Sequence, residues 1–76
     1  MNLINKSVVA RNIYDSRLLY KINRSELALI VGVTTKSVYN WETEKTFPKL
    51  INILSLCNYF DRKVDEFLGI KMAPVL

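Results

Sequence analysis

The side chains best suited to recognition chemistry lie close together between residues 35 and 43. If this stretch is helical, its outer face carries five polar side chains: Thr35, Lys36, Tyr39, Asn40 and Thr43. Their hydroxyl, amide and ammonium groups make directional hydrogen bonds, which suit the edges of DNA bases and backbone phosphates. A helix that only faces water more often carries Glu and Lys four residues apart. The alternative is an ordinary amphipathic surface helix, and only the surrounding sequence separates the two interpretations.

Catalytic and metal-binding chemistry has no comparable set of residues. The chain has no histidine, and Cys57 is its only cysteine, so it offers neither a disulfide nor a zinc ligand set. The sequence also lacks a nucleophile beside a base, a glycine-rich phosphate loop and a carboxylate pair. We therefore predict a protein that is not an enzyme and that uses no metal or cofactor. Cys57 lies in an apolar helical stripe, which indicates a packed hydrophobic residue rather than a redox group.

Size and composition indicate one small domain. The 76 residues are 50% hydrophobic and carry eleven Lys plus Arg against seven Asp plus Glu, a net charge of +4. A chain this short buries about 60% of its unfolded surface, which suffices for one core but hardly for a deep substrate cavity. The basic excess lies in the first two thirds of the sequence and suits a polyanionic partner. Because no secretory signal or membrane-spanning apolar run is present, we expect a cytoplasmic protein without a membrane partner.

Capping signals predict two consecutive helices in the middle of the chain. Asn23, followed three residues later by Glu26, is typical of a capping box and predicts a helix to about residue 31. Gly32 can adopt the positive φ that ends a helix, and Thr34 offers the N-cap of a second helix over about 35–43. The residues predicted to face inward are Leu27, Ala28, Val31, Val38 and Trp41. Together these features predict a helix-turn-helix over about residues 23–43.

Three further helices are predicted around this pair. One covers about residues 7–21 after Ser7 as N-cap, with Val9, Ile13, Leu18 and Tyr20 at helical spacing. Another begins near residue 49 or 50, after Pro48, and a short one covers about 64–68. The predicted buried stripe of the helix after Pro48 is Leu50, Ile53, Leu54, Cys57 and Phe60. Residues 1–69 would then form the domain and 70–76 an apolar C-terminal tail.

The stretch from Asn23 to Glu42 closely resembles the phage Cro and repressor family, also called the xenobiotic-response-element type. The residues that carry the resemblance are Leu27-Ala28, Gly32-Val33-Thr34, Val38, Trp41-Glu42, Pro48 and the apolar helix from Leu50. Residues 64–68 match the end of the family's domain, so the resemblance covers about residues 13–68. It implies an all-α, five-helix lambda-repressor-like fold. It also implies a Cro-like transcriptional regulator or repressor that binds a double-stranded DNA operator sequence-specifically.

The resemblance further implies roles for individual residues. Base contacts would come from Thr34, Thr35, Lys36, Tyr39 and Asn40, and phosphate contacts from Arg24, Thr43 and Lys45. Asn40 could pair with an adenine through two hydrogen bonds, and Lys36 could reach the O6/N7 edge of a guanine. Arg17 and Glu42 would form a partly buried structural ion pair instead of contacting DNA.

Three departures from the family pattern bear on these roles. Arg24 stands where the family commonly has Gln, so a phosphate contact is kept but the amide that braces a neighbouring recognition residue is lost. Glu44 replaces a usual Gly and places a negative charge near the expected DNA backbone. Asp61 and Arg62 replace a Gly and an apolar residue, which predicts a looser turn before the last helix, or one that faces a partner.

The sequence is compatible with two functions. One helix-turn-helix reads about four or five base pairs, so DNA binding predicts a homodimer on a near-palindromic operator. The candidate protein interface is an apolar set that exceeds what a small monomer usually exposes: Tyr59, Phe67, Ile70, Met72, Val75 and Leu76. The same set motivates the alternative, an antirepressor or antitoxin that captures a repressor or a toxin. The acidic Glu44 would favour this alternative.

Overall fold

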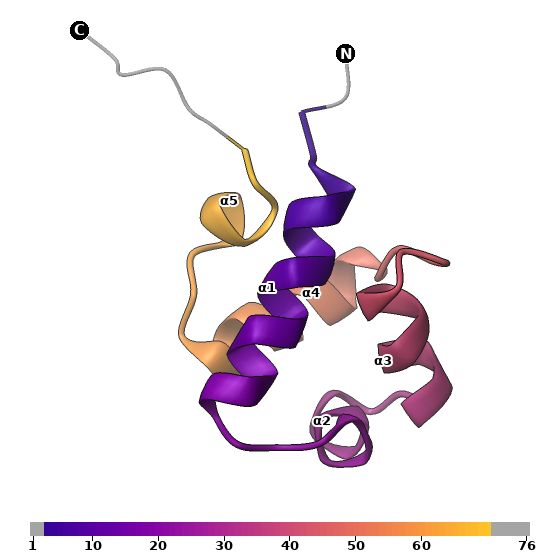
Figure 1. The fold of residues 1–76 in the computed structure, drawn as a ribbon. Coiled ribbons are helices and arrows are strands. Elements are labelled where there is room, and N and C mark those ends of the chain that lie inside the picture. The colour runs from indigo at the N-terminus through magenta and orange to yellow at the C-terminus, as the bar shows by residue number, and fades with distance from the viewer. Residues whose placement is uncertain (1–2, 71–76) are drawn as a thin grey trace, which may run out of the picture.

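The computed structural model describes residues 3–70, which form five helices and no strand. The helices are α1 (Lys6–Leu19), α2 (Arg24–Val31), α3 (Thr35–Glu42), α4 (Leu50–Phe60) and α5 (Val64–Phe67). In Figure 1, α1 runs through the middle of the molecule, with α3 on one side and α5 on the other. The predicted all-α fold is confirmed. Within the described range, no helix is long and apolar enough to cross a membrane.

The core is formed by side chains from all five helices. Its members are Val9, Ile13, Leu27, Ala28, Val38, Trp41, Ile53, Leu56, Cys57, Phe60, Phe67 and Leu68. Cys57 is buried among them as a packed hydrophobic residue, as predicted. Burial raises the pKa of the Cys57 thiol, which keeps it protonated and unreactive at neutral pH.

The predicted ends of the two central helices are confirmed. The Asn23 side chain accepts from the Glu26 N–H at 2.8 Å, and the Glu26 carboxylate accepts from the Asn23 N–H at 2.9 Å. Gly32 ends α2 at φ 76°, and the Thr34 hydroxyl accepts from the Ser37 N–H at 3.1 Å. Local chemistry within three residues determines each of these ends, so the sequence alone identifies them.

The prediction that Ser7 caps α1 is wrong. Asn5 is the N-cap, because its side-chain oxygen accepts from the Val8 N–H at 3.2 Å, while Ser7 lies inside the first turn. The N–H of Asn5 also donates to the Leu68 carbonyl at 3.1 Å. The start of α1 is therefore set partly by a residue 63 positions further along the chain, a contact that no local signal indicates.

The predicted inner faces of α1 and α4 are partly wrong. Leu18 and Tyr20 are exposed, and α1 buries Ser16 and Arg17 on its inner side. In α4, Leu50 and Leu54 are 69% and 48% exposed, whereas Leu56 is fully buried. Since α4 is apolar around most of its circumference, periodicity does not determine which stripe meets the core.

Two turns keep the left-handed backbone expected of glycine without having glycine. Glu44 has φ 64° and Asp61 has φ 53°. The Arg62 N–H donates to the Cys57 carbonyl at 2.9 Å, which closes the end of α4. A backbone hydrogen bond therefore closes the turn between α4 and α5, while a looser turn, or one that faces a partner, stays a prediction.

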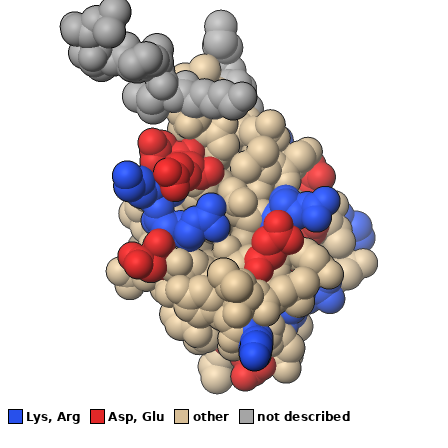
Figure 2. Space-filling model, turned by 60° about the vertical axis from the view of Figure 1, so that its left-hand side comes forward, with Lys and Arg blue, Asp and Glu red and all other residues tan. Residues whose placement is uncertain are grey.

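Charge is mixed on the side of the molecule that carries α5. Figure 2 turns this side forward and shows Lys and Arg side chains interspersed with Asp and Glu. Helix α5 itself carries two exposed carboxylates, Asp65 and Glu66. A surface of mixed charge does not favour binding of a polyanion. The better candidate is the opposite side of α1, where α3 lies.

Candidate nucleic-acid interface

The orientation of α3 is fixed by two inward side chains, Val38 and Trp41, which are buried in the core. Because these residues are three apart on a helix, the opposite face points to solvent. The predicted contact residues occupy that face or its edge: Thr35, Lys36, Tyr39 and Thr43 are exposed, and Asn40 is half-buried. The structure thus brings together the five polar residues that the spacing placed on one face.

The N-terminal end of α3 is tied to itself and to α2. The Thr34 hydroxyl lies 2.9 Å from the Ser37 hydroxyl and accepts from the Ser37 N–H. The Thr35 hydroxyl donates to the Ser25 hydroxyl of α2 at 3.3 Å. The two threonine hydroxyls that were assigned to base contacts therefore already have protein partners, whereas the Lys36 side chain extends from the exposed face.

The C-terminal end of α3 is closed by Thr43 and followed by an acidic side chain. The Thr43 hydroxyl donates to the Tyr39 carbonyl at 2.9 Å. The Glu44 carboxylate accepts from the Ser7 hydroxyl of α1 at 3.1 Å, which fixes its position beside the start of α1. Lys45 comes next and is exposed, with its N–H donating to the Asn40 carbonyl at 2.9 Å.

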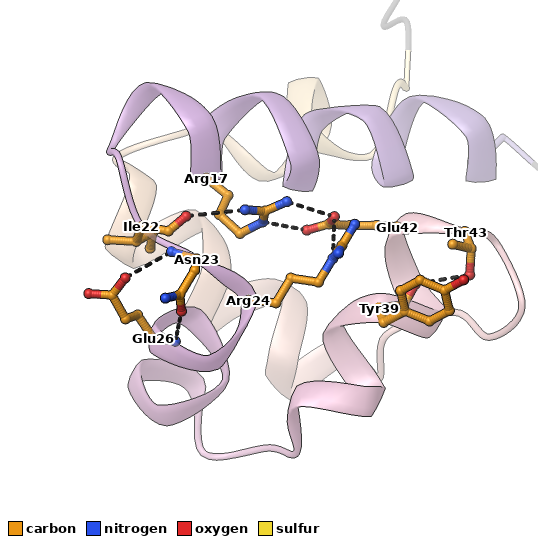
Figure 3. A network of polar contacts seen from close by, with 8 residues as sticks. All are labelled: Arg17, Ile22, Asn23, Arg24, Glu26, Tyr39, Glu42 and Thr43. Carbon is orange, nitrogen blue, oxygen red and sulfur yellow. Dashed lines mark hydrogen bonds and ion pairs between the residues drawn. The ribbon is translucent and has the colours of Figure 1, made fainter.

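A buried carboxylate joins the first three helices (Figure 3). Glu42 of α3, with its side chain 3% exposed, accepts two hydrogen bonds from Arg17 of α1, at 2.8 Å from Nε and 3.1 Å from Nη2. Arg17 also donates to the Ile22 carbonyl at 3.2 Å. The hydrogen bond to Glu42 raises the pKa of Arg17, so the guanidinium stays charged. The ion pair expected from the resemblance is present.

Arg24, the predicted phosphate contact, has two partners within the protein. Its Nε donates to Glu42 Oε1 at 3.0 Å, and its guanidinium carbon lies 5.2 Å from the centre of the Tyr39 ring. The side chain remains 37% exposed. Sequence reasoning missed both contacts, because they join α2 to residues 15 and 18 positions away on α3, and no local pattern indicates them.

The candidate protein interface is only partly available. Phe67 is fully buried in the core, because it is the inward residue of the short helix α5, so its assignment to a surface is wrong. Tyr59 is half-buried and packs against Tyr20 and Phe60, with ring centres 5.5 and 5.2 Å away. Ile70 packs against the core. Met72, Val75 and Leu76 lie outside the described residues.

This geometry defines a helix-turn-helix protein: two short helices meet through a glycine turn, and the second presents a polar face. The chain belongs to the helix-turn-helix family, whose profile matches residues 13–67. This match confirms the predicted relation to Cro-type and repressor proteins.

Three solved structures share the fold. One is the P22 c2 repressor protein in complex with the synthetic operator 9T in the presence of Tl⁺, with a TM-score of 0.75 and 29% identity over 80% of this chain and 94% of that chain. The nuclear magnetic resonance structure of the P22 c2 repressor DNA-binding domain gives a TM-score of 0.76 and 27% identity over 87% of each chain. A transcriptional regulator from Listeria innocua gives a TM-score of 0.81 and 21% identity, over 88% of this chain and 63% of that one. No curated protein sequence matches.

Proposed function

We infer that this chain is a sequence-specific, double-stranded DNA-binding transcriptional regulator of the Cro-like repressor kind, with α3 as its recognition helix. The observation that carries this inference is the exposed polar face of α3, which burial of Val38 and Trp41 directs outward. Support also comes from the fold, which is shared with the P22 c2 repressor protein, solved with a synthetic operator. An α-helix with such a face fits the major groove, which is about 12 Å wide.

Base reading is assigned first to Lys36 and Asn40. Lys36 lies in the first turn of α3, where side chains reach furthest into the groove, and its ammonium can donate to guanine O6 and N7. Asn40 lies one turn further along, and its amide can both donate to and accept from adenine. Thr34 and Thr35 would supply secondary contacts, since their hydroxyls already bond Ser37 and Ser25.

The phosphate contact is assigned first to Lys45. This residue is exposed and follows α3 directly, at the place where the chain would leave the groove. Thr43 could donate to a phosphate only by releasing the Tyr39 carbonyl, so its contact would be weaker. A homodimer completes the proposal, because two domains on half-sites about 34 Å apart read enough base pairs for useful specificity.

The test is a selection from random double-stranded DNA with the purified chain, followed by affinity measurements on the enriched sequence. We expect a near-palindromic site with half-sites about one helical turn apart. Affinity should fall about tenfold or more when one conserved base pair of a half-site is changed, as each mismatch costs about 1–3 kcal/mol. Equal affinity for enriched and random duplexes would contradict sequence-specific binding.

A further inference from the structure

Arg24 lies between two side chains of the recognition helix. Its Nε donates to Glu42 at 3.0 Å, and its guanidinium lies over the Tyr39 ring at 5.2 Å. Residues 39 and 42 are three apart on α3 and therefore lie on adjacent parts of one side of the helix. Arg24 thus connects the buried carboxylate of α3 to an aromatic ring on its exposed face, as Figure 3 shows.

The charge of Arg24 is not required to neutralise Glu42. Arg17 already provides a paired set of two hydrogen bonds to both carboxylate oxygens, at 2.8 and 3.1 Å. Arg24 adds a single further hydrogen bond to Oε1 and leaves the three-residue group with a net positive charge. The charge of Arg24 therefore acts mainly on the Tyr39 ring. No other cation lies over this ring among the contacts of the described residues.

The position of the Tyr39 ring depends on this contact. Tyr39 is 46% exposed and is not among the side chains that pack against the core, so several rotamers are open to it. A guanidinium over the face of the ring is attracted by the negative charge density there, and its flat shape also stacks well. The contact favours the Tyr39 rotamer that points to the α2 side of the recognition helix. Tyr39 is the sequence neighbour of Asn40.

We propose that Arg24 is a positioning residue for base recognition. Anchored by Glu42, it holds Tyr39 in one orientation on the exposed polar face of α3, and it touches no base itself. This inference rests on the proposed function. It differs from the phosphate contact that the resemblance implies, because a positioning residue affects discrimination at one base pair, whereas a phosphate contact affects all sequences alike.

The experiment compares Arg24→Met and Tyr39→Leu on the selected operator and on its complete set of single-base variants. Met keeps most of the length of Arg and removes the charge. We expect Arg24→Met to lower discrimination about two- to fivefold at the base pair that Tyr39→Leu also affects, which is the population change that an exposed cation–π contact sustains. The double variant should lose no more discrimination than Tyr39→Leu alone, and Arg24→Lys should recover part of it.

Lys45→Met is the matched control, because it removes one exposed charge that lacks the ring contact. It should weaken all operators alike and reduce the slope of log affinity against log salt by about 0.9. If Arg24→Met behaves in the same way, Arg24 is a phosphate contact and the proposal is overturned. Unchanged discrimination in Arg24→Met would overturn it as well.

A second readout does not depend on DNA. In the free protein, the side-chain proton signals of Arg24 should be shifted upfield by the Tyr39 ring and should return to ordinary positions in Tyr39→Leu. Trp41 signals, which report the core, should stay unchanged. If no shift is present, the positioning contact does not exist, whatever the selection gives. If the shift is present but no DNA site is enriched, the proposed function fails while the contact itself stands.

Discussion

Glu42 contributes strongly to the stability of the fold, because its buried carboxylate joins three helices. Removing it would leave Arg17 buried without a partner for its charge. We predict that Glu42→Ala lowers the free energy of unfolding by about 3–5 kcal/mol, as for other buried ion pairs broken from one side. Chemical denaturation followed by circular dichroism measures this change.

The two arginines on Glu42 provide an internal comparison for that prediction. Arg17→Met should destabilise strongly, because it removes two hydrogen bonds from the buried carboxylate and leaves only the single one from Arg24. Arg24→Met should cost about 1 kcal/mol or less, as for a partly exposed pair. Equal losses for the two variants would show that Arg24 contributes to the folded core rather than to the surface.

Asn40 is the residue at which base reading can be separated from general affinity. We predict that Asn40→Ala costs about 1–3 kcal/mol at one operator position and relaxes the preference there, since the amide supplies two hydrogen bonds to one base. Fluorescence anisotropy on single-base operator variants measures the effect. An equal loss on every duplex would remove Asn40 from the base-reading set.

At the scale of elements, two glycines with the same backbone conformation should respond differently to substitution. Gly32 and Gly69 have φ 76° and 73°, but a Cβ on Gly32 would meet nothing within 4 Å, whereas one on Gly69 would lie 3.0 Å from Val8 Cβ. We predict that Gly32→Ala costs about 1–2 kcal/mol from backbone strain alone. Gly69→Ala should cost more, because α1 must also move.

Thermal and denaturant unfolding of the two glycine variants checks this ranking. Binding by Gly32→Ala supplies an additional observation, since open space around the new methyl group leaves α3 in place. Affinity for the selected operator should therefore change little once the variant is folded. A large loss of affinity with little loss of stability would mean that the turn itself contacts DNA.

Sequence reasoning succeeded where an element is determined by neighbouring residues. The capping box at Asn23, the αL glycine at 32 and the cap at Thr34 are local, and all three are found. It failed where the partner is distant or the pattern is ambiguous. Arg24 reaches α3, Phe67 closes the core from a one-turn helix, and Leu50 and Leu54 lie outside the stripe that faces inward.

At the scale of the whole molecule, we predict a dimer whose affinity for DNA depends strongly on salt. A dimer that contacts six to ten phosphates should lose about 10³–10⁵ in DNA affinity between 50 and 200 mM salt. Analytical sedimentation of the free protein, then a salt titration on duplex DNA, measures both properties. A monomer whose DNA affinity depends little on salt would contradict the dimeric operator complex. It would favour the alternative function, binding of a protein partner.

The meeting of α5 with the start of α1 has a consequence for motion. Asn5 donates its N–H to the Leu68 carbonyl, Asn12 donates from its side chain to the Phe67 carbonyl at 3.0 Å, and Ser7 holds Glu44 beside the end of α3. We predict that these contacts make the N-terminal half of α1, the single turn of α5 and the loop after the recognition helix open together as one unit of local unfolding. A local unfolding that begins at α5 would thus also release the loop after α3 that contains Glu44. The motion of one edge of the exposed polar face of α3 would then depend on α5, which lies on the other side of α1.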